Sequence, residues 1–330
     1  MSHDNRHIWG IVLAGGEGKR LRQFLRSQYG ATCPKQFCAI TGTRSMLQHT
    51  IDRAGRVISP GQIVTIVSRQ HLCCAQEQLG QLRPGTLLVQ PFNRETAPGL
   101  LYPLLHISRH DPDAIVCILP SDHFILEEEL FMEYVSNACS FVAASSSSTV
   151  LLGVEPQQPD GEYGWIETGS RIPRGDGTDY FEVGGFSEKP DSAAAGRLYS
   201  RGGLVNTFVL ISKASNLLNL FRLFTPALYD TFMGVRHALG SSSEEEAVEK
   251  AYLSVPSINF SHEILGKNPE GLRVLRVKNV YWSDWGDPSR ILADLGRHGA
   301  LRTIGRPVLP QQVHSPVQAA VAAEPIGEYQ

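Results

Sequence analysis

The chain has 330 residues, which is enough for one large α/β domain or two smaller ones. Hydrophobic residues make up 42% and charged residues 19%, and the net charge of −3 excludes the general basic surface that nucleic-acid binding needs. The first residues are polar, unlike a signal peptide, and no run of about 18 apolar residues could span a bilayer. We therefore expect a cytoplasmic protein with no nucleic-acid or membrane partner.

The six cysteines do not have the spacing of a zinc site. The adjacent pair Cys73-Cys74 and the core-like Cys117 are typical of reduced thiols in a cytosolic protein. We therefore expect reduced thiols.

The first predicted element is a strand that ends in a glycine-rich turn. Apolar residues run from Ile8 to Ala14 and stop at Gly15-Gly16, and Gly18 is followed by the basic Arg20 and Arg22. A short apolar run bounded by glycines predicts a buried strand. Glycines let the backbone approach a bulky ligand, and N–H groups near a helix start attract anions. The pattern predicts a phosphate-binding turn at the edge of an α/β sheet.

Two well-known phosphate-binding signatures are absent from this turn. The dinucleotide pattern G-x-G-x-x-G fails at Leu21, and the Walker pattern is missing. A plain turn between a strand and a helix, with no ligand, is the alternative interpretation.

The remaining elements follow from hydrophobic periodicity and turn residues. Residues 22–33 have few core-type side chains, so we expect a mobile active-site loop there. A helix is expected after Thr96 as its N-cap, with Pro98 in the first turn and Pro103 shortening or bending it. The other predicted elements are helices at 46–57, 70–82, 213–224, 243–253 and 288–300, and strands at 63–67, 86–90, 114–119, 149–154, 162–167, 180–187, 204–212 and 272–280.

Strands and helices alternate in the first half of the chain, which predicts right-handed parallel crossovers and a doubly wound sheet. Ligands of such sheets bind beyond the carboxyl ends of the strands, where Gly15, Gln90 and Asp122 lie. The second half is more mixed. Its strands at 162–167 and 180–187 are expected to pair antiparallel around a polar loop.

Two segments are expected to carry no site. The acidic run 244–246 starts a predicted helix with Ser243 and Glu246 in capping-box spacing, which favours a solvated helix start over a metal site. From about residue 305 the chain is rich in proline and alanine without a periodic apolar face, so we predict a flexible tail at 305–330. We find no hexapeptide repeats of the kind that build a left-handed β-helix.

Seven short segments, in order along the chain, resemble one enzyme family, the sugar-nucleotide pyrophosphorylases, which join a sugar 1-phosphate to a nucleoside triphosphate. The glycine loop L-A-G-G-E-G-K-R-L with P-K-Q-F at 34–37 is most similar to the mannose-1-phosphate guanylyltransferase branch. The other matching segments are R-E-T-A-P at 94–98, L-P-S-D-H at 119–123, G-V-E-P-x-x-P at 153–159 with Y-G-W-I-E at 163–167, F-S-E-K-P at 186–190, L-V-N-T-F at 204–208 and W-S-D-W-G at 282–286. The resemblance covers about residues 8–300.

The resemblance implies the fold and the domain organisation. We expect a doubly wound, Rossmann-like mixed sheet of the nucleotide-diphospho-sugar transferase type, without the C-terminal β-helix that many relatives carry. The nucleotidyltransferase domain would span 1–304, with a nucleotide-binding half at about 1–148 and a sugar-binding half at about 149–304.

The family's reaction implies a magnesium site. An oxygen of the sugar phosphate attacks the α-phosphorus of the triphosphate, and Mg²⁺ bridges the two anionic partners. The resemblance assigns Asp122 and Asp284 as its ligands, with Asp287 as the fallback, and hard Mg²⁺ prefers such carboxylates. The alternative for each aspartate is a helix N-cap or a turn. His123 stands without a partner histidine, which favours a structural role over a ligand.

The resemblance also assigns the substrate-binding residues. Arg20 and Lys35 should grip the β- and γ-phosphates, and Lys189 should hold the sugar phosphate. The nucleotide-binding set is Leu13, Ala14, Gly15, Gly16, Gly18, Gln90, Arg94, Thr96 and Ala97. The sugar-binding set is Gly164, Glu188, Asn206 and Thr207.

Two departures from the family pattern make the sugar less secure than the reaction. Many relatives have W-N-S-G where Phe208 replaces the glycine here, and they commonly have Asn or Gly where Glu95 stands. We predict Mg²⁺-dependent transfer from GTP to mannose 1-phosphate. The alternatives are another sugar 1-phosphate, another triphosphate (UTP, dTTP or ATP), a non-catalytic regulatory subunit that binds sugar nucleotides, and a nucleotide-sugar glycosyltransferase. A homodimer is left open.

Overall fold

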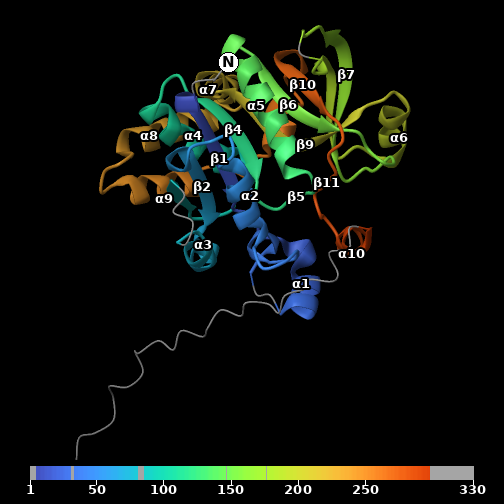
Figure 1. Ribbon diagram of the computed structural model, residues 1–330. Coiled ribbons are helices and arrows are strands. Elements are labelled where there is room, and N and C mark those ends of the chain that lie inside the picture. The colour runs from blue at the N-terminus through green and yellow to red at the C-terminus, as the bar shows by residue number, and fades with distance from the viewer. Residues whose placement is uncertain (1–4, 31–32, 81–84, 146, 176, 298–330) are drawn as a thin grey trace, which may run out of the picture.

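A computed structural model describes residues 5–30, 33–80, 85–145, 147–175 and 177–297 of the chain (Figure 1). The tail predicted at 305–330 lies outside these residues. Within them, no helix has both the length and the apolar character needed to cross a membrane.

The centre of the molecule is a nine-stranded mixed sheet with the strand order β3-β2-β1-β4-β9-β6-β10-β8-β7, and a two-stranded sheet joins β11 to β5. The strands are β1 (Ile8–Ala14), β2 (Ile63–Ser68), β3 (Thr86–Gln90), β4 (Ile115–Pro120), β5 (Phe124–Ile125), β6 (Thr149–Val154), β7 (Gly164–Ile172), β8 (Tyr180–Glu188), β9 (Leu204–Lys213), β10 (Leu272–Val277) and β11 (Trp282–Ser283). The predicted doubly wound mixed sheet is confirmed.

The two halves of the sheet are paired differently. β1 is parallel to β2 and to β4, in the registers Gly10 to Ile63 and Ile8 to Ile115. β9 is antiparallel to both β4 and β6, and β7 pairs antiparallel with β8, as predicted. Because β4, β6 and β10 all run in the same direction as β1, their carboxyl ends meet at one edge of the sheet.

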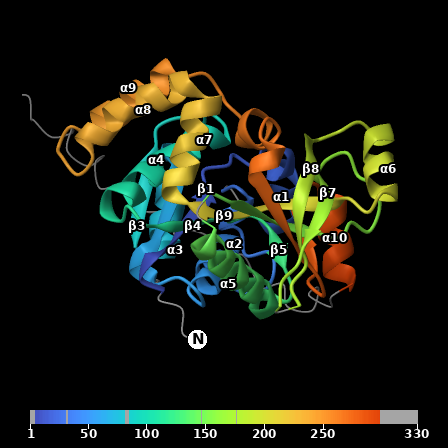
Figure 2. The ribbon, with the colours of Figure 1, turned by 90° about the horizontal axis from the view of Figure 1, so that it is seen from above.

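Helices cover both faces of the sheet, with α4, α7, α8 and α9 on one side and α2 and α5 on the other (Figure 2). The α-helices are α1 (Arg22–Tyr29), α2 (Met46–Ala54), α3 (Leu72–Leu79), α4 (Thr96–His110), α5 (Glu128–Ala144), α6 (Ser192–Ser200), α7 (Ala214–Phe224), α8 (Pro226–Ala238), α9 (Glu244–Ser254) and α10 (Pro288–Arg297). We did not predict α5, α6 or α8.

Period-two alternation along the strands produces two apolar cores. On β1, Ile11 packs with α4 and α7, whereas its neighbour Val12 packs with α2 and α5 on the opposite face. A third, smaller core lies beyond the sheet edge, where α1 and α10 lie side by side (Figure 1) and bury Leu25 against Ile291.

The third core corrects the expected loop at 22–33. Residues 22–29 form α1, because Leu25 and Tyr29, four residues apart, share one helix face and are buried in that core. These two side chains are buried in a core that includes α10, which is far away in the sequence. The local sequence around residues 22–29 therefore did not indicate their burial.

Two cap predictions are wrong, and one of the two effects expected of Pro103 does not occur. Pro103 does not shorten α4, which continues to His110. Thr96 is the first helical residue rather than the N-cap, and Ser243 makes no side-chain cap on α9. The capping box occurs instead on α2, where Ser45 accepts from the Gln48 backbone N–H.

The cysteine prediction is also corrected, because Cys33 and Cys74 form a disulfide. It joins the segment before Lys35 to α3. Cys38, Cys117 and Cys139 are free and buried, and Cys73 is free and exposed.

Candidate active site

A cavity of about 320 Å³ lies at the edge of the sheet where the carboxyl ends of β1 and β4 meet. Residues from both halves of the chain line it. The predicted site residues among them are Leu13, Gly16, Arg20, Thr96, Asp122, Gly164, Glu188, Lys189, Asn206 and Asp284. Long-range strand pairing has therefore brought most of the predicted residues to one place.

The glycine loop after β1 is held from beneath by Gln36. The amide of this buried side chain donates to the carbonyls of Ala14, at 3.0 Å, and of Gly16, at 2.8 Å. Gly18 has a left-handed backbone (φ 58°), which glycine adopts without the strain of a side chain. We did not assign Gln36 a role, although it belongs to the P-K-Q-F segment, and that segment was the signal that could have revealed it.

Gln90 supports the same loop and does not line the cavity. Its Nε2 donates to the Ser68 hydroxyl at 3.2 Å, and that hydroxyl donates to the Gly15 carbonyl at 2.7 Å. A Cβ on Gly15 would lie only 2.5 Å from the Gln90 Nε2. The glycine therefore allows the loop to lie directly on a buried amide.

Lys35 is buried and joins the two candidate metal-binding loops. Its Nζ donates to the carbonyls of Asp284 at 2.5 Å and Trp285 at 3.1 Å, and it lies 3.2 Å from an Asp122 carboxylate oxygen. Burial alone would raise the pKa of Asp122, but the Lys35 ammonium brings that pKa below its ordinary value. Asp122 is therefore held as a carboxylate.

Asp284 has a cationic partner of its own. One carboxylate oxygen, Oδ1, accepts from Arg290 Nη1 at 2.6 Å and from the Gly286 backbone N–H at 3.1 Å. The fallback ligand, Asp287, caps α10 by accepting from the backbone N–H groups of Ser289 and Arg290. Asp287 is thus a helix N-cap, which was the alternative to metal binding.

The carboxylates of Asp122 and Asp284 suit Mg²⁺ chemically. Both line the same cavity, and both are hard oxygen donors. Among the residues that the structure describes, no group of three or more His, Cys, Asp and Glu could hold a metal. Two carboxylates fit Mg²⁺ all the same, because this ion usually keeps water and substrate oxygens as its other ligands.

His123 lines the same cavity, with its Nε2 3.7 Å from Asp122 Oδ1, and it packs edge-on against the Trp282 ring at 5.1 Å. Its burial lowers its pKa, so the ring is neutral at pH 7. This packing is consistent with the expected structural role.

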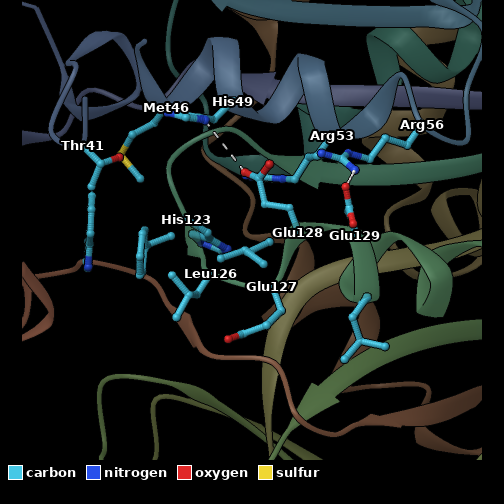
Figure 3. A pocket seen from close by; sticks show the side chains of 14 residues that line it. Thr41, Met46, His49, Arg53, Arg56, His123, Leu126, Glu127, Glu128 and Glu129 are labelled. Atoms are coloured by element: carbon cyan, nitrogen blue, oxygen red, sulfur yellow. Dashed lines mark hydrogen bonds and ion pairs between the residues drawn. The ribbon is translucent and has the colours of Figure 1, made fainter. Parts of the chain in front are cut away.

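A second, neighbouring cavity of about 560 Å³ also includes His123 in its wall (Figure 3). Its charged side chains pair with one another, as Arg53 does with Glu128 at 3.1 Å and Arg56 with Glu129 at 2.6 Å. These pairs occupy both arginines of the wall, and the Glu127 carboxylate accepts from the Tyr281 backbone N–H, so we assign this cavity no site.

Among the residues predicted to bind the sugar, Gly164 and Glu188 touch across the pairing of β7 and β8. A Cβ on Gly164 would lie 2.8 Å from Glu188 Oε2, so the glycine makes room for this carboxylate. Partial burial raises the pKa of Glu188, which the Lys189 ammonium partly offsets. Lys189 is exposed, and its backbone N–H donates to the Tyr163 carbonyl at 3.1 Å.

Of three consecutive residues on β9, the first and third face the cavity and the middle one faces the core. Asn206 lines the cavity and accepts from the Phe208 backbone N–H at 3.1 Å. Thr207 is fully buried, does not line the cavity, and donates to the Leu152 carbonyl at 2.8 Å. Phe208 lines the cavity with a left-handed backbone (φ 57°) and packs edge-on against Phe260.

The start of α4 is tied to the segment before the π-helical turn at 261–265. Arg94 donates to the Tyr252 carbonyl, Thr96 accepts from the Phe260 N–H at 2.8 Å, and the Ala97 N–H donates to the Ile258 carbonyl. Of the three predicted residues here, the cavity includes Thr96 alone.

Arg20 follows the glycine loop at the mouth of the cavity. Its guanidinium donates to Glu162 at 2.8 Å, and both side chains are exposed. An exposed pair of this kind is weak and can open for an incoming anion.

The family model for nucleotidyl transferases matches residues 9–294. The chain belongs to the nucleotidyl transferase family. The predicted family and fold are thereby confirmed.

Several individual proteins of this family are similar to the chain over most of its length. The chain is 33% identical over 286 residues to the xanthan biosynthesis protein XanB of Xanthomonas campestris pv. campestris, covering 86% of this chain and 58% of that protein. It is 29% identical to a mannose-1-phosphate guanylyltransferase of Escherichia coli, covering 86% and 59%. The chain therefore spans somewhat more than half the length of these relatives.

A solved structure shares the fold. A Thermus thermophilus protein titled mannose-1-phosphate geranyltransferase superposes with a TM-score of 0.70 at 23% identity, covering 87% of this chain and 79% of that one. At this identity the likeness shows the fold alone.

Proposed function

We propose that this protein transfers a guanylyl group from GTP to mannose 1-phosphate, giving GDP-mannose and pyrophosphate. One observation carries the proposal: Arg20, Asp122, Lys189 and Asp284, from four distant segments, line one cavity at the carboxyl edge of the sheet. The names of the relatives support the nucleotide and the sugar, and family membership supports the reaction class.

The residues divide between the two anionic substrates. The glycine loop offers backbone N–H groups to the triphosphate, and Arg20, once released from Glu162, would bind the pyrophosphate that leaves. Lys189 would hold the sugar phosphate in line with the α-phosphorus. The carboxylate of Glu188 and the amide of Asn206 would accept hydrogen bonds from sugar hydroxyls.

Lys35 has a different role in this proposal from the one expected. Its ammonium is buried against Asp122 and two carbonyls. It would fix the positions of the Asp122 and Asp284 loops. It would bind a phosphate only if it first released the Asp122 carboxylate or the two carbonyls.

Asp122 and Asp284 would hold Mg²⁺. When bound, this ion would neutralise the two phosphates and polarise the α-phosphoryl group. The protein's own contribution is to aim the two carboxylates into the cavity and to keep Asp122 ionised through Lys35.

The test is pyrophosphate release from GTP, UTP, dTTP and ATP, each combined with mannose, glucose and related 1-phosphates, with Mg²⁺ and with EDTA. Mg²⁺-dependent release with GTP and mannose 1-phosphate is the expected result. Release with another pair would keep the reaction but change the substrate, and Phe208 and Glu95 would be the first residues to examine. Release of a nucleoside diphosphate would indicate a glycosyltransferase. Silence with detectable nucleotide-sugar binding would indicate a regulatory subunit.

A further inference from the structure

Arg290, on the first turns of α10, contacts three carboxylates at once. Its Nη1 lies 2.6 Å from Asp284, its Nη2 lies 2.6 Å from Asp160, and its Nε lies 3.2 Å from Asp287. The guanidinium also lies over the Tyr163 ring, 4.5 Å from its centre. The sequence motifs did not single out Arg290.

The guanidinium reaches Asp284 from behind the candidate active site. Arg290 and Asp160 line a separate cavity of about 300 Å³, which does not include Asp284. Asp284 lines the candidate cavity, which does not include Arg290 or Asp160. Tyr163 belongs to both walls and separates the two spaces.

This arrangement argues against a substrate-binding arginine. Each of the three guanidinium nitrogens already faces a carboxylate, so a phosphate would have to share a nitrogen with a carboxylate or displace it. Three carboxylates around one guanidinium also leave two negative charges in excess. That excess would attract a divalent cation and repel an anion.

We infer that Arg290 is a positioning residue, which clamps Asp284 so that one carboxylate oxygen is left for a divalent cation. Oδ1 is engaged by Arg290 and by the Gly286 N–H, whereas Oδ2 has no hydrogen-bond partner among the described residues. Asp160 anchors the far side of the guanidinium and fixes the orientation of the clamp. This inference rests on the proposed metal-binding role of Asp284.

The experiment measures GTP binding to the full chain by calorimetry, once with Mn²⁺ and once with EDTA. The ratio of the two affinities reports the contribution of the metal without any turnover. Arg290→Lys keeps the charge but lacks the planar fork that contacts Asp284 and Asp160 through separate nitrogens. We expect this variant to lower the ratio about tenfold, as substitutions behind a metal ligand do, and to leave binding in EDTA unchanged.

Two control variants separate this inference from the proposed function. Arg297→Lys changes an arginine of the same helix that contacts Gln157, and it should keep the wild-type ratio. Asp284→Asn should abolish the metal contribution. If Asp284→Asn keeps the ratio, the proposed metal site is wrong. If Asp284→Asn loses it and Arg290→Lys keeps it, the clamp is wrong.

A variant that removes the charge of Arg290 provides a further check, because the ratio of the two GTP affinities can either rise or fall. If Arg290 only repelled the metal, Arg290→Met would raise the ratio, and this result would overturn the inference. Should Arg290→Lys fail to fold, Asp160→Asn loosens the same clamp without touching Asp284. The new amide can keep the acceptor for the Glu162 N–H at Oδ1. A smaller loss of the ratio is expected, and an unchanged ratio would again contradict the clamp.

Discussion

The nucleotide side and the sugar side of the cavity are built in different ways. On the nucleotide side, a buried layer of Gln36, Ser68 and Gln90 supports the glycine loop, and the loop itself faces the cavity. On the sugar side, Glu188 and Asn206 face the cavity directly from strands β8 and β9. The motif on the first side therefore marks mainly the geometry of a loop, with the Arg20 side chain at the cavity, whereas the motifs on the second side mark side chains that face the cavity.

The largest effect is expected where the two sides meet. Asp122→Ala removes the carboxylate paired with Lys35, and Asp284→Ala removes the one paired with Arg290. Each should lower kcat on the order of 10³-fold, because charge stabilisation at the transferred phosphoryl group is lost. Steady-state pyrophosphate release measures this. A variant with a near-normal rate would remove its aspartate from the metal site.

A pair of glycine substitutions sharpens the comparison. A Cβ on Gly15 would push against Gln90 on the nucleotide side, and a Cβ on Gly164 would push against Glu188 on the sugar side. We expect Gly15→Ala to raise the KM for the triphosphate about tenfold and Gly164→Ala to raise that for the sugar phosphate similarly, since a misplacement of about 1 Å can cost up to 10²-fold. Gly196→Ala on α6, where a Cβ meets nothing within 4 Å, is the control. Equal effects on both KM values would contradict the division.

The third prediction concerns the strained backbone of Phe208. Phe208→Ala and Phe208→Gly both remove the ring, but only glycine relieves the left-handed conformation. The glycine variant should therefore have a free energy of unfolding about 1 kcal/mol higher than the alanine variant. Urea denaturation measures the difference. Equal stabilities would show that this backbone changes once the ring is gone.

The smallest effect is a pH dependence from Glu188. Burial raises its pKa in the folded protein, so the folded state holds this proton more tightly than the unfolded state. Stability contributed by this group is therefore present below the ordinary carboxyl pKa and is lost as the pH rises through the raised value. Glu188→Gln should lack this loss and gain stability relative to wild type as the pH rises above the ordinary carboxyl pKa. Thermal unfolding over that rise in pH measures it, and parallel curves would contradict the burial effect.

Where the signal is local, sequence patterns predicted which residues stand at the ends of the strands, and the roles of these residues stay predictions. The glycine loop, Asp122 after β4 and the Glu188-Lys189 step after β8 stand where expected. Such positions are fixed by turn residues and by the ends of apolar runs. Thr207 was predicted for the sugar site, yet it turns into the core, because neighbouring strand residues face opposite sides.

Charged side chains with distant partners were predicted least well. The acidic run 244–246 was expected to be solvated, but Glu244 is half-buried and accepts from Tyr102 at 2.8 Å and lies 2.6 Å from the His106 ring nitrogen. These partners lie on α4, more than 130 residues away along the chain. Nothing local to α9 indicates them.

The sequence by itself determined the strands of the main sheet, their order along the chain and the chemistry available at the carboxyl edge of that sheet, because hydrophobic periodicity and glycine turns act over a few residues. Only the tertiary structure decided which cation meets which carboxylate. Lys35 meets Asp122 across 87 positions, and Arg290 meets Asp160 across 130. Such pairs form where chain segments far apart in sequence are packed together, and local periodicity carries no information about that packing.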